Sequence, residues 1–394
     1  METTGYRWVV LAVGTGAQAA TATYFLGLAA VAPALRDHFG LSLAGVGALL
    51  GAVSVGLIAT LILWGGAADR YGERGVMVLG LVGAALALGA TAMVRDPVAA
   101  GALLALAGAS GASVNAASGR AVLTWFPTQH RGMAMAVRQT SVPIGAAAAA
   151  VALPAVVDHL GVPAVFDTLA VCCAVAAAAV ALWVREPPDR VAASSTGRVG
   201  FATVLADSRL LRLSLAGFLL VVPQFLGSVF LVEVLHDGAG MSLTVAGVLL
   251  AVTQVLGAAG RLANGAWSDR VGSRLGPLRI VAVAIAVGFG LAAALEPGPA
   301  PLLAAVLVAA AALAISWNGL VFTAAGELAP AGRAATAMAV SNTACFVAAA
   351  IAPVVGGLVA QTAGWPAMLA IGTVTALAAV LALRGLEAHQ VAGR

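Results

Sequence analysis

The stretch GGAADRYGER at residues 65–74 recurs as GAWSDRVGSR at residues 265–274. The two copies are 269 − 69 = 200 residues apart in a chain of 394, and glycine, aspartate, arginine, glycine and arginine recur in the same register. Each copy ends one apolar run and precedes the next. A charged turn that is repeated at half-length within a hydrophobic chain indicates a duplicated membrane bundle.

Composition assigns the chain to the membrane proteins. Hydrophobic residues make up 61% of it and charged residues 9%, whereas soluble domains carry about 25% charged residues. A helix needs about 20 apolar residues to cross a bilayer, and the runs here are too long and too uniformly apolar for barrel strands. We therefore predict an all-α polytopic membrane protein with twelve transmembrane helices in two pseudo-symmetric six-helix bundles. The expected spans lie near residues 8–35, 43–65, 75–94, 98–124, 133–157, 164–184, 213–235, 243–264, 279–295, 302–326, 335–361 and 366–384.

The arginines predict the orientation of these helices. All 20 basic residues are arginine, and placing the N-terminus inside leaves only Arg36 and Arg95 in outer loops. This distribution follows the positive-inside rule, so both termini are expected in the cytoplasm. The basic charge balance reflects this topology rather than nucleic-acid binding. We predict one six-helix bundle at residues 1–184, a cytoplasmic linker at 185–212 and a second bundle at 213–394.

The repeated turn also carries a family resemblance. The pattern Gly-x-x-x-Asp-Arg-x-Gly-x-Arg lies between spans 2 and 3 and again between spans 8 and 9. It resembles the signature loop of the major facilitator superfamily, and the resemblance extends to the twelve spans and the central linker. Leu256 departs from it where the second copy would repeat Gly56, and Glu73 and Ser273 stand where a basic residue is usual. The resemblance implies two halves around a central cavity that opens alternately to each side.

The turn is expected to close the cytoplasmic side. Gly65 and Gly265 remove side chains where two helices must approach. A carboxylate at Asp69 or Asp269 can accept hydrogen bonds from the open N–H groups at another helix's N-terminus; the resemblance implies the start of span 11 for Asp69 and of span 5 for Asp269. The simpler alternative is an ordinary positively charged hairpin turn. The predicted gating residues are Gly65, Asp69, Arg70, Gly72, Arg74, Arg131, Gly265, Asp269, Arg270, Gly272, Arg274, Glu327 and Arg333.

A second near-repeat supports the duplication. Residues 125–134 join spans 4 and 5, and residues 328–334 join spans 10 and 11. Transporters of this superfamily often place an acid before the arginine of each such connection. Glu327 fills that place in the second half, whereas Thr124 occupies it in the first. We therefore expect a cytoplasmic charge network that is unequal between the halves.

Polar groups at depth are the candidates for substrate contact. Intramembrane polar side chains are costly and tend to face a cavity, although many simply bond a neighbouring helix. Arg120 lies in the inner part of span 4 and Arg138 just inside span 5, and no acidic residue sits in the middle of a predicted span. Embedded cations favour anionic or neutral solutes, and the alternative for both arginines is a role in the gate or at lipid phosphates. The predicted substrate-binding residues are Tyr24, Asn115, Arg138, Gln224, Gln254, Trp317 and Asn318.

Further motifs narrow the function. The run RQTSVPIG at residues 138–145 resembles a subgroup of bacterial facilitators that includes cyanate-type, nitroimidazole-type and other organic-anion carriers. The Gly-Pro-x-x-Gly-Gly signature of drug–proton antiporters is missing from residues 153–158. We predict a secondary transporter that moves a small organic anion or polar metabolite by alternating access. The alternative is proton-coupled efflux of drug-like hydrophobic compounds, with a receptor or scaffold third.

No enzyme activity is expected. The five histidines fall at span ends or in loops, and the chain has no nucleotide-binding motif. We predict no cofactor, no metal site and no nucleic-acid partner. The expected partners are a small-molecule substrate and the lipid bilayer, with protons as the candidate coupling ion, for a monomer in the cytoplasmic membrane.

Overall fold

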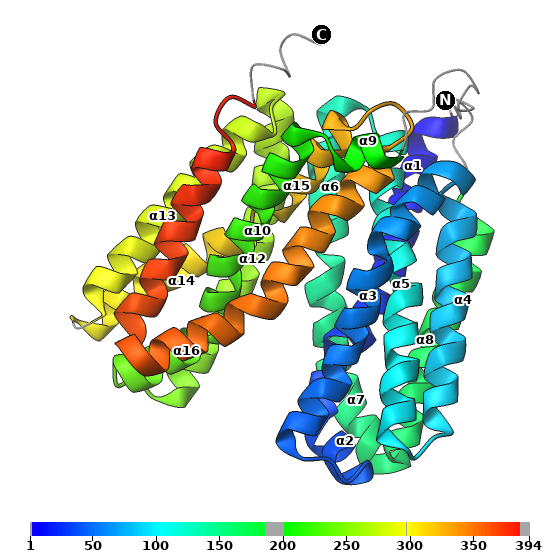
Figure 1. Cartoon of the computed structure of the whole chain (residues 1–394), viewed down its shortest axis with the longest axis horizontal. Coiled ribbons are helices and arrows are strands. Elements are labelled where there is room, and N and C mark those ends of the chain that lie inside the picture. The colour runs from blue at the N-terminus through cyan, green and yellow to red at the C-terminus, as the bar shows by residue number, and fades with distance from the viewer. Residues whose placement is uncertain (1, 186–200, 297, 387–394) are drawn as a thin grey trace. The chain divides into compact units, whose positions relative to one another are not determined.

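The computed structural model describes residues 2–185, 201–296 and 298–386, and every regular element in those ranges is helical (Figure 1). The first half contains α1 (Glu2–Phe25), the 3-10 helix η1 (Gly27–Val31), α2 (Ala32–His38), α3 (Leu43–Tyr71), α4 (Glu73–Ala92), α5 (Pro97–Trp125), α6 (Thr128–Gln139), α7 (Ser141–Leu160) and α8 (Val162–Trp183). The second half contains α9 (Phe201–Leu205), α10 (Ser208–Val229), α11 (Leu231–Glu233), the π-turn η2 (Val234–Gly238), α12 (Leu243–Val271), α13 (Leu275–Leu295), α14 (Ala300–Ile315), α15 (Asn318–Leu328) and α16 (Ala334–Ala382).

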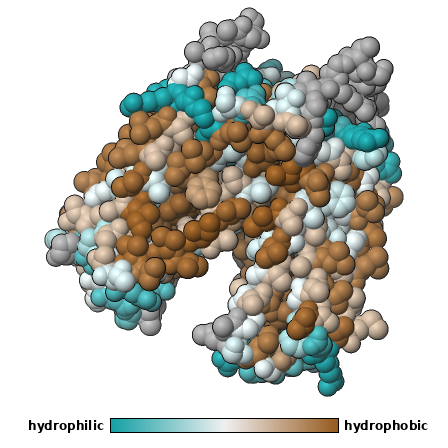
Figure 2. Space-filling model, viewed as in Figure 1, coloured by the Kyte–Doolittle hydropathy of each residue, from teal (hydrophilic) through white to brown (hydrophobic). Residues whose placement is uncertain are grey.

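The helices are long enough and apolar enough for a membrane. Eleven helical stretches among the described residues meet both conditions. The longest, the 49-residue helix α16, contains Gly364 at φ 84°, outside helical geometry, so it comprises two spans. On the face shown in Figure 2, hydrophobic residues cover the sides of the helices and hydrophilic residues gather at their ends. The predicted all-helical, twelve-span membrane fold is confirmed.

The duplication is visible in the helices that precede the repeated turn. α3 and α12 each contain 29 residues, and their starting positions differ by 243 − 43 = 200. Ser42 and Ser242 cap their N-termini, each accepting a hydrogen bond from the backbone N–H three residues further on, at 3.1 and 3.3 Å. Gly72 and Gly272 end them with φ of 92° and 66°, a region that disfavours any side chain. The same local signals therefore start and stop both helices.

The packing divides the chain into two compact units, and each unit contains segments from both halves of the sequence. Unit 1 comprises Met1–Pro127, Val137–Val204 and Ala329–Val340. Unit 2 comprises Thr128–Ala136, Leu205–Leu328 and Ser341–Arg394. The first turns of α16 thus belong to unit 1, and the first turns of α6 belong to unit 2.

The predicted linker at 185–212 is partly helical. Residues 186–200 lie outside the described ranges. α9 occupies Phe201–Leu205, and α10 begins at Ser208, earlier than the predicted start of the second bundle at residue 213. Asp207 caps α10, its Oδ1 accepting a hydrogen bond from the Arg209 N–H at 2.8 Å. The cap explains why this helix extends further toward the linker than its hydropathy predicts.

Glycines allow α3 and α5 of unit 1 to pack backbone against backbone. A Cβ on Gly56 of α3 would overlap the carbonyl of Ala105 on α5, and a Cβ on Gly108 of α5 would overlap the carbonyl of Val53 on α3. Helices in lipid associate through close contacts of this kind, because lipid tails provide no hydrophobic driving force between them. The two glycines therefore set how closely these helices approach.

Replacing Gly56 with alanine is expected to destabilise unit 1, since the new Cβ would push α3 away from α5. Overpacking of this kind costs about 1–3 kcal/mol, so Gly56→Ala should lower the apparent Tm of the purified protein. Gly51→Ala is the matched control on the same helix, because no described atom lies within 4 Å of the Cβ it would add. An equal Tm for the two variants would contradict the packing.

Candidate functional site

Asp69 holds the beginning of α16 in unit 1. Its Oδ1 accepts a hydrogen bond from the Ala335 N–H at 3.0 Å, and its Oδ2 accepts from the N–H and the hydroxyl of Thr336 at 2.9 and 2.6 Å. α16 begins at Ala334, so both N–H groups belong to its first turn and lack an acceptor within the helix. The carboxylate also complements the positive end of the helix dipole. We call this contact the unit 1 latch.

Asp269 binds α6 in unit 2, one turn further into the helix. Its Oδ1 and Oδ2 accept hydrogen bonds from the N–H groups of Gly132 and Met133 at 2.9 and 2.8 Å. Arg274 Nη2 donates to the carbonyl of Thr128 at 2.5 Å, and that carbonyl is the acceptor that Gly132 would use in a regular helix. Asp269 and Arg274 therefore add partners to both groups of one hydrogen bond of α6, the Gly132 N–H and the Thr128 carbonyl. We call this contact the unit 2 latch.

The two latches differ in where the bound residues lie in their helix. α6 begins four residues before Gly132, whereas α16 begins one residue before Ala335. The sequence placed the start of span 5 at residue 133, whereas α6 begins at Thr128. Before α16, Gly332 adopts φ 76° and interrupts the helical path. The equivalent residue of the first half, 332 − 203 = 129, is Gln129, and it lies inside α6. The aspartate therefore meets the first turn of α16 but the second turn of α6.

The motif glycines permit both approaches. A Cβ on Gly65 would lie 2.8 Å from the Cβ of Ala339 and 2.9 Å from the carbonyl oxygen of Ala335. A Cβ on Gly265 would lie 2.6 Å from the carbonyl oxygen of Gly132. Such distances are shorter than normal packing allows, so a larger residue at either position would push the latched helix away.

Arg274 is the centre of a charged cluster in unit 2. Only 2% of its side chain is exposed, and its Nη1 donates to Asp269 Oδ1 at 2.6 Å and to Ser268 Oγ at 2.9 Å. Its Nη2 donates to Glu327 Oε1 at 3.2 Å, and Arg131 lies 3.9 Å from the same oxygen. We call Arg131, Asp269, Arg274 and Glu327 the unit 2 cluster. Each buried charge in it has an opposite charge beside it.

A second charged cluster lies in unit 1. Arg120 Nη1 donates to Glu73 Oε1 at 2.5 Å, and its Nε lies 3.3 Å from Asp69 Oδ1. Thr124 donates its hydroxyl to the same Glu73 oxygen at 3.2 Å. We call Asp69, Glu73, Arg120 and Thr124 the unit 1 cluster. Sequence analysis noted Glu73 only as a departure from the motif and left two roles open for Arg120; the structure places both beside the latch.

The remaining predicted gating arginines, three from the repeated turn and one from the connection before α16, are not members of these clusters. Arg70 is exposed, and its guanidinium lies 5.2 Å from the ring centre of Tyr71. Arg74 donates to the carbonyl of Ala181 on α8 at 2.5 Å. Arg270 is exposed, and Arg333 directly precedes α16. Exposed arginines at helix ends are suited to contact with lipid phosphates.

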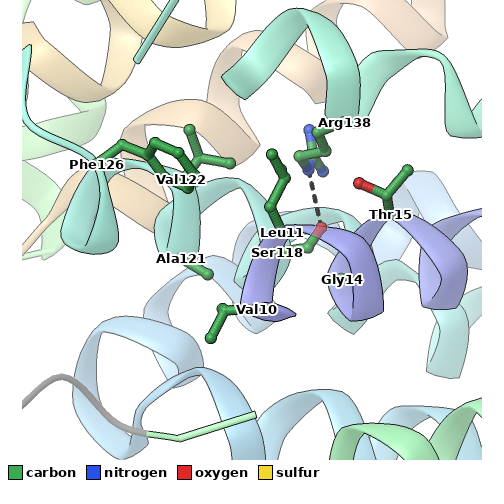
Figure 3. A pocket seen from close by; sticks show the side chains of 9 residues that line it. All are labelled: Val10, Leu11, Gly14, Thr15, Ser118, Ala121, Val122, Phe126 and Arg138. Atoms are coloured by element: carbon green, nitrogen blue, oxygen red, sulfur yellow. Dashed lines mark hydrogen bonds between the residues drawn. The ribbon is translucent and has the colours of Figure 1, made fainter. Parts of the chain in front are cut away.

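Arg138 lines a small pocket between α1 and α5 in unit 1 (Figure 3). It is 3% exposed. Its Nε donates to Ser118 Oγ at 2.9 Å, its Nη1 to Gln139 Oε1 at 3.0 Å and its Nη2 to the carbonyl of Asn115 at 2.6 Å. All three of these acceptors are uncharged, and the three bonds orient the guanidinium. Apolar side chains, among them Phe126, form most of the remaining wall.

Two unpartnered polar atoms lie close to this arginine network. Gln18 Nε2 donates to Asn115 Oδ1 at 3.2 Å, and Arg138 Nη2 donates to the same oxygen at 3.3 Å. Thr15 Oγ1 and Gln18 Oε1 are buried without a hydrogen-bond partner among the described atoms. Such atoms are uncommon in folded proteins and indicate a place for water or a polar ligand. Sequence analysis missed Thr15 and Gln18, although their three-residue spacing puts them on one face of α1.

The polar groups of unit 2 surround a break in a predicted span. The sequence predicted one helix at 302–326, but α14 ends at Ile315 and α15 begins at Asn318. Arg261 Nε donates to the carbonyl of Ile315 at 2.8 Å. Asn264 Nδ2 donates to the hydroxyl of Ser316 at 2.9 Å. Side chains of α12 thus satisfy groups that the break would otherwise leave open.

The other predicted substrate residues are placed differently from one another. Asn318 Nδ2 donates to Gln224 Oε1 at 3.3 Å, so these two lie together in unit 2. Trp317 is fully buried, and its Nε1 has no hydrogen-bond partner among the described atoms. Gln254 is exposed on α12. Tyr24 packs in the apolar core of unit 1 and donates its hydroxyl to a carbonyl of α5, so it acts there as a packing residue.

Comparison with known proteins assigns this arrangement to one family. The family model described as Major Facilitator Superfamily matches residues 11–353, most of the chain. The chain belongs to the major facilitator superfamily. Members of this superfamily are membrane transporters that bind small molecules, so the chain is a multi-pass secondary transporter and not an enzyme. Among the described residues, no group of three or more His, Cys, Asp and Glu side chains could hold a metal ion.

Relatives and solved structures support the same assignment. The Mycobacterium tuberculosis protein named "Uncharacterized MFS-type transporter Rv2994" is 35% identical over 376 residues, covering 95% of this chain and 84% of that protein. The human organic anion transporter MFSD10 matches with a TM-score of 0.77 at 19% identity, covering 96% of this chain and 99% of that one. The transporter FucP in its outward conformation matches with a TM-score of 0.77 at 17% identity, covering 97% and 99%. At these identities the solved structures establish the superfamily fold alone.

Replacing Asp69 with asparagine is expected to loosen the first turn of α16 selectively. Hydrogen bonds to a charged group contribute about 1.5–3 kcal/mol, so amide hydrogen exchange at Ala335 and Thr336 should become roughly tenfold faster or more. Asp269→Asn should speed exchange at Gly132 and Met133 by a smaller factor, because these N–H groups also have acceptors within α6, and should leave α16 unchanged. Hydrogen–deuterium exchange with mass spectrometry on the full chain in lipid nanodiscs measures both segments at once. Equal acceleration of the two segments in either variant would contradict the assignment of the latches.

Proposed function

We propose that this superfamily transporter moves a small organic anion across the cytoplasmic membrane and that Arg138 binds the anionic group. The observation that carries the proposal is a 3%-exposed guanidinium on the wall of a pocket in unit 1. The resemblance of residues 138–145 to organic-anion and cyanate-type carriers supports the same class of substrate. The matched structure of an organic anion transporter adds only that the same fold can carry such a substrate.

The chemistry of Arg138 supports an anionic ligand. A charged side chain at this depth is costly unless water, a counter-ion or an anion meets it. A guanidinium presents a planar set of N–H donors that matches a carboxylate in a way that lysine does not. The acceptors Ser118, Gln139 and Asn115 hold the group in one orientation.

Neighbouring polar groups extend the proposed site. Thr15 and Gln18 offer buried oxygen atoms without partners among the described residues, beside the arginine network. We assign them, with Asn115, to the substrate's polar groups or to a water that bridges to it. Gln224, Asn318 and Trp317 remain the candidates in unit 2, and Gln254 remains one on α12. We leave Tyr24 out of the site because its hydroxyl is already bonded within the core.

We further propose that the latches form and break during transport. α16 begins in unit 1 and continues in unit 2, and α6 begins in unit 2 before the chain returns to unit 1. Release of Asp69 or Asp269 would therefore free the start of a helix whose continuation belongs to the other unit. The bundles at 1–184 and 213–394, the linker at 185–212, cytoplasmic termini and a monomeric state complete the proposal.

Flux measurements in proteoliposomes test whether the protein transports an organic anion. Uptake of radiolabelled monocarboxylates, matched neutral amides and hydrophobic cations, each with and without a pH gradient, separates the classes. Organic-anion transport predicts uptake of the carboxylate but not of the amide. Uptake of the hydrophobic cation alone, driven by the pH gradient, would instead support the alternative of proton-coupled drug efflux and overturn the anion proposal.

Replacing Arg138 with lysine is expected to weaken anion binding about tenfold or more, because a point charge loses the paired donors of the guanidinium. Equilibrium binding of the transported carboxylate should be measured beside its flux. Arg36→Lys is the matched control, since Arg36 is partly exposed and pairs with Asp37 outside the site. Unaltered binding with slower flux of every substrate would move Arg138 from the substrate site to the gate.

A further inference from the structure

The two charged clusters use the same kinds of residue at exchanged positions. In unit 2 the arginine, Arg274, comes from the turn after α12, and the second carboxylate, Glu327, comes from α15. In unit 1 the arginine, Arg120, comes from α5, and the second carboxylate, Glu73, comes from the first turn of α4. In both units the arginine bridges the latch aspartate and the second carboxylate. In unit 2 the turn supplies the arginine and a later helix the second carboxylate. In unit 1 a later helix supplies the arginine, and the second carboxylate directly follows the turn's glycine.

The register of the duplication shows how regular this exchange is. Positions in the repeated turn correspond at a shift of 273 − 73 = 200. Positions near the ends of α5 and α15 correspond at a shift of 327 − 124 = 203. Three charged residues of the clusters correspond to hydroxyl residues in the other unit. The corresponding pairs are Glu73 with Ser273, Arg120 with Thr323, and Thr124 with Glu327.

We propose that Glu73 and Arg120 are positioning residues of the unit 1 latch, in a charge arrangement inverted relative to that of unit 2. Glu73 holds Arg120, and Arg120 orients Asp69 toward the first turn of α16. The inference rests on the proposed role of Asp69 as a latch. It adds two residues that act on the unit 1 latch through Asp69.

The distances rank the two partners of Arg120. Its Nη1 lies 2.5 Å from Glu73, whereas its Nε lies 3.3 Å from Asp69. Glu73 is therefore the principal partner, and both oxygens of Asp69 stay directed at the N–H groups of α16. The side chains of both carboxylates are 1% exposed. A buried carboxylate is costly without a cation, and Arg120 contacts both carboxylates, with the shorter distance to Glu73.

The inversion also changes what each latch depends on. In unit 2, Arg274 and Glu327 themselves contact α6, at the Thr128 carbonyl and at Arg131. In unit 1, a threonine at position 124 cannot form the ion pair that Glu327 makes. The hold on α16 then depends on the hydrogen bonds of Asp69 and hence on its orientation. The unit 1 latch should accordingly respond to Glu73 and Arg120, although neither is part of the contact itself.

Amide hydrogen exchange of the full chain in lipid nanodiscs tests the proposal. Glu73→Gln should speed exchange at Ala335 and Thr336 several-fold, because Arg120 loses its anchor and Asp69 loses its orientation. Exchange at Gly132 and Met133 should stay unchanged, which serves as an internal control for folding. Glu233→Gln, which removes the charge of an exposed carboxylate on α11, is the matched control variant. Unchanged exchange at α16 in Glu73→Gln would overturn the proposal.

The double variant separates positioning from independent effects. Arg120→Gln should speed exchange at α16 at least as much as Glu73→Gln does, and adding Glu73→Gln to it should cause no further increase. An additive increase would show that Glu73 acts without Arg120 and would overturn the proposal. If Asp69→Asn itself leaves exchange at α16 unchanged, the latch fails and this inference fails with it. If Asp69→Asn accelerates exchange and Glu73→Gln does not, only this inference fails.

Discussion

The N–H groups at the start of a membrane helix have no acceptor within that helix, and in this protein a buried aspartate supplies one. Asp69 does so for α16, and Asp269 supplies an acceptor one turn further into α6. A buried carboxylate in turn requires donors and a cation, which explains Arg120 and Arg274. The carboxylate must also come close to another helix, which explains Gly65 and Gly265. The repeated turn supplies the aspartate and the glycine in both units, and the arginine as well in unit 2.

Duplication preserved this constraint more strictly than it preserved the residues around it. α3 and α12 match in length, N-cap and terminal glycine, and both aspartates bind a helix. The cation reaches Asp69 from α5 but reaches Asp269 from its own turn. The requirement is electrostatic and local, so any arginine that reaches the carboxylate satisfies it. The arginine could therefore come from α5 in one half and from the turn in the other, and both latches are kept.

The fold could be predicted from the sequence because it depends on properties that can be summed or counted along the chain. Span length, apolar composition and the spacing of the two turns predicted the membrane helices and directed attention to Asp69 and Asp269. Breaks within a span were not accessible, because hydropathy averages across them. At the interruption near Ser316, Arg261 and Asn264 of α12 donate hydrogen bonds to the carbonyl of Ile315 and to Ser316. Such compensation is a tertiary contact that no local pattern in residues 302–326 reveals.

The candidate site was only partly accessible, for a related reason. Depth in the membrane selected Tyr24 and Asn115 equally, since both are polar residues within apolar runs. What separates them is the direction of each side chain around its helix. Tyr24 points into the core and bonds a carbonyl of α5, whereas Asn115 accepts hydrogen bonds from Gln18 and Arg138. A helix that is apolar on every side carries no amphipathic signal from which to read that direction.

The contrast between Arg120 and Arg138 shows how the surroundings assign different roles to the same residue type. Both are arginines near the inner ends of neighbouring spans, and the sequence left both roles open. Arg120 lies between two carboxylates, so its charge is compensated within unit 1 and its geometry serves the latch. The hydrogen bonds that hold Arg138 run to a hydroxyl, a side-chain amide and a backbone carbonyl. These bonds fix the direction of the guanidinium, and a cation held on a pocket wall is suited to attract an anion.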